Sequence, residues 1–154
     1  MDRASLCSFT YATVHGPLTI SATAKGVCAV EFGQAQSEGR HCATELTNRA
    51  ANQMQEYLAG KRRVFDVPLD VEGSAFQKAV WAQADAIPYG TTATATELAA
   101  AIGRPGSHRS VGTALKQCRL APLIAVHRVE NPGATGKNAR VFRALCAMEQ
   151  ANLS

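Results

Sequence analysis

Hydrophobic and polar residues alternate along the first part of the chain in a way that is typical of short antiparallel strands. Apolar and β-branched side chains recur in residues 6–13, 18–23 and 27–32. The breaks between these segments contain His15-Gly16-Pro17 and Lys25-Gly26, and glycine and proline at such places favour tight turns. The pattern therefore predicts a three-stranded antiparallel meander.

The spacing then changes to the helical period, after a polar loop over 33–40. Between about Ala43 and Leu58, apolar side chains recur three to four residues apart, at Leu46, Ala50, Met54, Tyr57 and Leu58. This spacing predicts one helix. Residues 64–72 contain Pro68 and look extended, so we interpret them as the connection to a second half. We expect a first domain at 1–66, a linker at 67–73 and a second domain at 74–154.

The second half is predicted to be mainly helical. Ser74, Thr94 and Ser107 are suitable N-cap residues, and Glu97 stands where a capping box with Thr94 requires it. The helix after Thr94 is expected to end near residue 102, and the helix after Ser107 near residue 117. Two short helices joined by a glycine-containing turn match a helix-turn-helix at about 94–117. A last helix is expected over 141–150.

Charge is distributed unevenly between the two halves of this 154-residue chain. Residues 1–74 hold 7 Lys and Arg against 8 Asp and Glu, a net charge of −1, whereas residues 75–154 hold 9 against 4, a net charge of +5. A basic second half fits a polyanionic partner, and a generally basic surface is the other explanation. We find no apolar run of membrane-spanning length and no signal pattern, so we expect a cytoplasmic protein without membrane association.

The cysteines change this picture little. They are five in number and scattered, which argues against a disulfide framework, and none belongs to a Cys-x-x-Cys pair. Cys42 beside His41 is interpreted as incidental. We therefore expect neither a metal site nor a cofactor.

Several motifs in fixed order resemble the O6-alkylguanine-DNA alkyltransferases and their alkyltransferase-like relatives. The matching segments are 56–60, 65–69, 73–81, 87–90, 97–99, 109–112 and 127–129. The resemblance implies an α+β fold: a ribonuclease-H-like N-terminal α/β domain with antiparallel strands, and a helical, winged-helix-like C-terminal domain. It also implies a monomer whose recognition helix enters the minor groove of double-stranded DNA and flips out an alkylated guanine.

The alkyl-acceptor position departs from the family pattern. Where the family has Pro-Cys-His-Arg, this chain has Ala125-Val126-His127-Arg128, and a valine side chain cannot be a nucleophile. His127 and Glu149 match the histidine–glutamate pair that serves the family's thiol. Without a thiol, we expect this degenerate site to tie the last helix to the core, with Arg128 as a buried bridge. No catalytic residue is expected.

The resemblance also assigns DNA-contacting residues. Arg109 matches the arginine that fills the space left by the flipped base, and Gly112 and Ala114 keep one helical face small. The residues assigned to DNA binding are Arg109, Ser107, Gly112, Thr113, Lys116 and Arg128, and those assigned to the lesion pocket are Tyr89, Ala125 and Val126. Ala95 replaces a tyrosine of the family, and the loop at 131–137 is shorter than the family's loop.

Three functions remain open from the sequence. The preferred one is a non-catalytic DNA-repair protein that recognises alkylated guanine and marks it for downstream repair proteins. The second is a methylated-DNA–protein-cysteine methyltransferase that uses another thiol, either Cys118, whose pKa the neighbouring Arg119 would lower, or Cys146. The third is a repurposed helix-turn-helix regulator that binds undamaged DNA or a protein partner.

Overall fold

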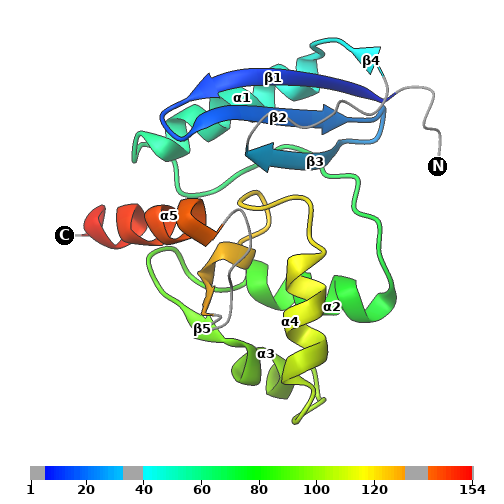
Figure 1. Ribbon diagram of the computed structural model, residues 1–154, viewed down its shortest axis with the longest axis vertical. Coiled ribbons are helices and arrows are strands. Elements are labelled where there is room, and N and C mark those ends of the chain that lie inside the picture. Colours follow the sequence, from blue (N-terminus) through cyan, green and yellow to red (C-terminus); the bar gives the residue numbers. More distant parts are fainter. Residues whose placement is uncertain (1–5, 33–39, 131–138, 154) are drawn as a thin grey trace. The chain divides into compact units, whose positions relative to one another are not determined.

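The protein consists of two compact units, Met1–Val71 and Glu72–Ser154, each with its own buried apolar side chains (Figure 1). The computed structural model describes residues 6–32, 40–130 and 139–153. Strands dominate the first unit and helices the second, so the predicted mixed α+β fold is confirmed.

The first unit is a four-stranded sheet with one helix packed against it. The strands are β1 (Cys7–Thr13), β2 (Gly16–Ala22), β3 (Val27–Phe32) and β4 (Arg40–His41), in the spatial order β3-β2-β1-β4. The meander β1-β2-β3 is antiparallel, as the sequence predicts, whereas β4 pairs in parallel with β1. We did not expect β4, because a strand of two residues is too short to show a period of two.

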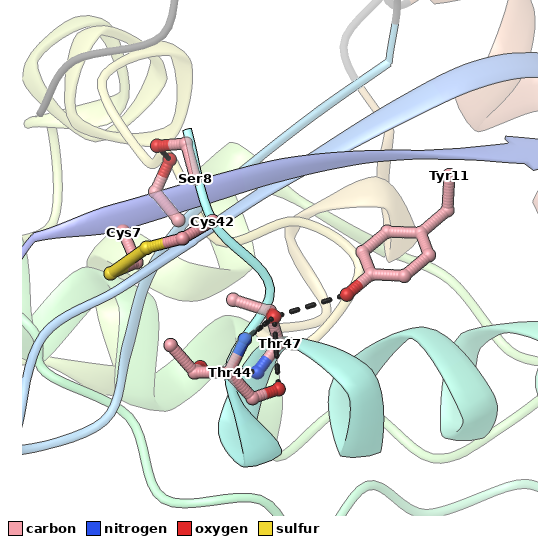
Figure 2. The surroundings of a disulfide bond; sticks show 7 residues. Cys7, Ser8, Tyr11, Cys42, Thr44 and Thr47 are labelled. Carbon is pink, nitrogen blue, oxygen red and sulfur yellow. Dashed lines mark hydrogen bonds between the residues drawn. A yellow bond between two sulfur atoms is a disulfide. The ribbon is translucent and has the colours of Figure 1, made fainter. Parts of the chain in front are cut away.

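Helix α1 (Glu45–Leu58) lies against strands β1, β2 and β3. Its predicted apolar positions Ala50, Met54 and Tyr57 are fully buried, which confirms the helical spacing. Thr44 caps the helix through a capping box with Thr47, and the Tyr11 hydroxyl donates to the Thr47 hydroxyl at 3.0 Å (Figure 2). The helix start is therefore fixed to strand β1.

A disulfide between Cys7 and Cys42 joins the beginning of β1 to the residue after β4 (Figure 2). The Cα atoms are 5.4 Å apart, and the Cys42 amide donates to the Ser8 carbonyl at 3.0 Å. The scattered cysteines led us to expect no disulfide framework, and for this pair that expectation was wrong. The 35-residue separation hides the pair in the sequence, and the β1–β4 pairing brings the two thiols together.

The beginning of the expected linker pairs with the first unit. The Val27 amide donates to the Pro68 carbonyl at 2.9 Å, and the Asp70 amide donates to the Val27 carbonyl at 2.8 Å. The backbones approach so closely that a Cβ atom at Gly26 would lie 2.6 Å from the Pro68 carbonyl oxygen. We placed these residues in the linker because Pro68 interrupts any strand pattern, whereas the two units divide between Val71 and Glu72.

The second unit is built from helices with one small sheet. Its elements are α2 (Ala75–Asp85), β5 (Ala93–Thr94), α3 (Ala95–Ala101), α4 (His108–Lys116), the 3-10 turn η2 (Val126–Arg128), β6 (Val129–Glu130) and α5 (Ala139–Ala151). All four predicted helices are present. Helices α2, α3 and α4 pack on one another, and the Trp81 indole donates to the Ala114 carbonyl at 2.8 Å.

Strands β5 and β6 pair in parallel and bring together two segments that are far apart in the sequence. Ala93 lies opposite Val129, and Thr94 lies opposite Glu130. This pairing places Glu130 beside the start of α3. Among the helices of the described segments, none has the length and apolar character needed to cross a membrane.

Candidate nucleic-acid interface

Helices α3 and α4 form the predicted helix-turn-helix. The Thr94 hydroxyl caps α3 by accepting a hydrogen bond from the Glu97 amide at 3.1 Å, which is one of the two bonds of the expected capping box. Ser107 occupies the N-cap position of α4, but its side chain makes no capping bond. Its backbone, with φ −92° and ψ 25°, is not extended, and capping by a side chain requires an extended residue.

A groove of about 460 Å³ lies between the start of α3 and the exposed face of α4. The residues that line it are small, basic or hydroxyl-bearing, with one carboxylate: Thr94, Ala95, Thr96, His108, Arg109, Gly112, Thr113, Lys116 and Glu130. Four residues that the sequence assigned to DNA binding are therefore brought together here, namely Arg109, Gly112, Thr113 and Lys116.

The face of α4 that lines the groove carries no side chain at its centre, where Gly112 lies. A Cβ atom on Gly112 would meet no atom within 4 Å, so nothing inside the protein requires glycine there. Arg109 and Lys116 are exposed on either side, and the Thr113 hydroxyl donates to the Arg109 carbonyl at 3.2 Å. Ala114 does not belong to this face, contrary to our expectation, because it is buried against Trp81.

Val126 lies in a run of buried residues that precedes and includes η2. All residues from 120 to 129 are buried, and the side chain of Val126 adds to this apolar packing. The neighbouring Ala125 amide donates to the Asp85 carboxylate at 3.2 Å, which holds the turn against α2. The side chain at position 126 is thus a buried, chemically inert aliphatic group.

A buried charge cluster follows Val126. Glu149 on α5 is 1% exposed and accepts from His127 Nε2 at 2.7 Å and from Arg128 Nε and Nη2 at 2.8 and 3.1 Å. It also accepts from the Gly90 amide at 3.1 Å. Because an ionised carboxylate only accepts hydrogen bonds, the Nε2 atom of His127 carries the proton of its bond. Glu149 therefore joins α5 to η2 and to the turn after α2.

Arg128 does not fit its assignment to DNA binding. Its side chain is buried, donates to the Ile87 carbonyl at 2.8 Å as well as to Glu149, and lies 5.4 Å from the centre of the Tyr89 ring. A guanidinium held in this way is not available to phosphates. The alternative expectation of a buried bridge describes its geometry.

The assigned lesion-pocket residues do not line the groove of α4. Ala125 and Val126 are buried, and the Tyr89 hydroxyl contacts the Met148 sulfur at 3.6 Å. The short loop that we compared with the family's pocket wall, residues 131–137, lies outside the described residues.

The two alternative acceptor thiols are poorly suited to nucleophilic attack. Burial raises the pKa of Cys118 to about 11, and the Asp85 carboxylate adds to this rise, so the expected lowering by Arg119 is wrong. Burial and the Glu149 charge also raise the pKa of Cys146, whose thiol donates to the His127 carbonyl at 3.1 Å. Both thiols stay protonated at neutral pH, and the thiolate is the nucleophilic form.

A helix-turn-helix with an exposed basic groove defines the class of DNA-binding proteins, and here it is joined to a buried histidine–glutamate–arginine cluster. Two family models match the chain. Residues 7–71 match the ribonuclease-like domain of 6-O-methylguanine DNA methyltransferase, and residues 75–151 match its DNA binding domain. The chain belongs to the 6-O-methylguanine DNA methyltransferase family and is a DNA-binding protein of DNA repair.

Individual relatives support this membership. A methylated-DNA–protein-cysteine methyltransferase of Methanosarcina barkeri is 36% identical over 119 residues, 74% of this chain and 75% of the relative. The crystal structure of Mycobacterium tuberculosis O6-methylguanine methyltransferase has a TM-score of 0.86 at 29% identity and covers 96% of this chain and 94% of that chain. The structure of Mycobacterium tuberculosis OGT in complex with DNA has a TM-score of 0.84 at 30% identity, over 95% and 94% of the two chains.

Three groove residues, Thr96, His108 and Glu130, were not predicted from the sequence. His108 and Thr96 lie at the helix starts, where polarity is expected for reasons of capping, so their composition gives no separate signal. Glu130 reaches the groove only through the β5–β6 pairing. In the sequence, Glu130 directly follows the His127-Arg128-Val129 motif, and this position was the one indication that it is a site residue.

Proposed function

We propose that this protein recognises alkylated guanine in double-stranded DNA without transferring the alkyl group, and that it marks the lesion for downstream repair proteins. In this proposal the protein is a monomer that binds the minor groove through α4 and flips the damaged nucleotide. The observation that carries the proposal is Val126, which stands at the family's acceptor position inside an intact scaffold.

The chemistry at position 126 supports a binding role. Alkyl transfer needs a sulfur nucleophile, and the isopropyl group of Val126 has no lone pair to attack an alkyl carbon. His127 and Glu149 are hydrogen-bonded at 2.7 Å, but the side chain of Val126 before them has no acidic proton that this pair could accept. The pair then serves to hold α5 and η2 together.

The groove of α4 supports the retention of DNA binding. Extruding a nucleotide costs a few kcal/mol of lost stacking, and a guanidinium in the vacated space offsets part of this cost. Arg109 is exposed at the edge of the groove and suits that role, whereas Lys116 suits attraction of a backbone phosphate. Gly112 leaves room for a groove floor to approach the helix.

A catalytic role is the second candidate, because relatives such as the Methanosarcina barkeri protein are named methyltransferases. It requires a thiol other than the family's, and the raised pKa of Cys118 and of Cys146 argues against both. A relocated thiol would also have to meet the alkyl carbon at attack distance, and a misplacement of 1 Å costs about a hundredfold in rate.

The test of recognition is a competition titration. A labelled duplex with one central O6-methylguanine is bound by the full chain, and unlabelled duplexes with and without the lesion compete over a range of salt concentrations. We expect salt-sensitive binding with a preference for the lesion. Equal competition by both duplexes would remove lesion recognition, and footprints at particular undamaged sequences would favour a regulator.

The test of catalysis is intact-protein mass spectrometry after incubation with an O6-benzylguanine oligonucleotide. We expect no mass gain, and a benzyl adduct would overturn the proposal. The variant Val126→Cys should also react at least ~100-fold more slowly than the Methanosarcina barkeri relative, because the side chain at this position is buried and its neighbours differ from the family pattern. Rapid stoichiometric labelling of this variant would show that the pocket is intact.

A further inference from the structure

Among the described residues that line the groove of α4, Glu130 is the one carboxylate. A negative charge in a site for a polyanion opposes binding, because it lies close to phosphates of the same sign. The proposed roles of Arg109 and Lys116 therefore leave the negative charge of Glu130 unexplained. A carboxylate in this groove favours binding only where the ligand offers it a hydrogen-bond donor.

The carboxylate is held in place by its surroundings. The Thr92 hydroxyl donates to Glu130 Oε1 at 3.0 Å, and the pairing of Thr94 with Glu130 fixes the backbone of β6 beside α3. Within residues 40–130, Glu130 forms no ion pair with Arg109 or Lys116, so its charge is not neutralised by the groove's own cations. A carboxylate has several lone pairs and can accept from a ligand while it keeps the bond from Thr92.

The donors of DNA that face a minor-groove binder are few. Adenine and thymine present only acceptors there, and the exocyclic N2 amino group of guanine is the one base donor. From this geometry, we infer that Glu130 is a specificity-determining residue that accepts a hydrogen bond from the N2 amino group of a guanine adjacent to the flipped nucleotide. The inference rests on the proposed minor-groove recognition and adds a preference for G·C pairs beside the lesion.

The test compares duplexes that differ only in this amino group. Each contains one O6-methylguanine, and its neighbouring pairs are either G·C or I·C, since inosine lacks the N2 amino group. We expect the wild-type protein to bind the G·C duplex roughly tenfold more tightly, the usual size for a hydrogen bond to a charged group. Glu130→Ala should bind both duplexes equally, and Glu130→Gln should keep part of the preference because its amide oxygen still accepts.

Two further variants distinguish a hydrogen bond to a positioned Glu130 carboxylate from a general effect of negative charge near the groove. Glu97→Gln removes one exposed negative charge from α3 outside the groove lining, and it should leave the preference unchanged. Thr92→Val removes the hydroxyl that positions Glu130 and should reduce the preference while the carboxylate remains. Circular dichroism of each variant shows whether the fold is kept, and the ratio of the two affinities is insensitive to the fraction of folded protein.

The outcomes distinguish this inference from the proposed function. Lesion preference together with equal binding of G·C and I·C duplexes overturns the role of Glu130 and leaves lesion recognition standing. A preference that persists in Glu130→Ala overturns it as well, because the discrimination then comes from another group or from the altered stacking of inosine. A failure to bind any duplex overturns both proposals.

Discussion

Replacing Gly112 with alanine should make the protein more stable and a weaker DNA binder. Gly112 lies in the middle of α4, and a Cβ atom there would meet no atom within 4 Å. Glycine in a helix interior is roughly 0.5–1 kcal/mol less favourable than alanine because it has more backbone freedom to lose. The substitution should therefore raise the free energy of unfolding by up to ~1 kcal/mol, or the melting temperature by about 2–4 °C.

The same methyl group should interfere with DNA. It would project into the groove that Arg109 and Lys116 flank, where a close approach of the DNA leaves no room for it. Overfilling a tight contact costs about 1–3 kcal/mol, so we expect the affinity for a lesion duplex to fall roughly tenfold or more. A gain in stability with a loss of binding is unusual for a single added methyl group. It would show that DNA binding, and not the fold, requires glycine at position 112.

The assays are thermal or urea unfolding and fluorescence anisotropy with a labelled lesion duplex. Ser110→Ala is the matched control, since residue 110 is an exposed position of α4 that does not line the groove. The control should gain a few tenths of a kcal/mol at most and bind DNA as before. Unchanged DNA affinity of Gly112→Ala would refute the close approach, and lower stability would refute the open space at this position.

Three further predictions concern the groove, the charge cluster and the alternative thiol. Arg109→Ala should weaken lesion binding roughly tenfold or more with little change in salt dependence. Lys116→Ala should weaken binding to all duplexes alike and lower the slope of log affinity against log salt by about one. Equal effects of the two variants in titrations at several salt concentrations would contradict these roles. Glu149→Gln should lose about 3–5 kcal/mol in urea unfolding, because it leaves the buried arginine partner without a counter-charge, and Glu97→Gln should stay within about 0.5 kcal/mol of wild type. Because the pKa of Cys118 rises from its ordinary 9.0 to about 11 on folding, the protonated thiol is favoured in the folded state. Its contribution to stability is full below pH 9 and is lost as the pH rises towards 11. Native-state alkylation of Cys118, followed by mass spectrometry, should therefore remain slow until about pH 10, and fast labelling at pH 8 would contradict the raised pKa.

Periodicity made most of the fold predictable. The alternation over 6–13, 18–23 and 27–32 and the helical spacing of Ala50, Met54 and Tyr57 each reflect one buried face, and both were confirmed. Strand β4 and the β5–β6 pair could not be found in this way, because strands of two residues have no period. The disulfide and the groove position of Glu130 depend on these short pairings and were missed for the same reason.

Local reasoning was also insufficient where burial decides. Arg119 next to Cys118 suggested a reactive thiol, yet burial raises the pKa of this thiol and the Asp85 charge adds to the rise. Arg128 looked like a phosphate contact by its charge alone, but the carboxylate of Glu149 holds it inside the protein. Ser107 has the right residue type for a cap and the wrong backbone conformation. Each error came from judging a side chain by its chemistry before its surroundings were known.

The bonds of Glu149 bear on how relatives of this protein can be interpreted. The buried carboxylate accepts hydrogen bonds from His127, Arg128 and a backbone amide, and removing such a carboxylate is strongly destabilising whatever the protein does with DNA. None of these bonds involves the side chain of residue 126, so they are independent of the residue at that position, whereas a mutation that removes Glu149 removes all of them. An intact histidine–glutamate pair in a relative is consequently evidence for a folded second unit and not, by itself, evidence for alkyl transfer.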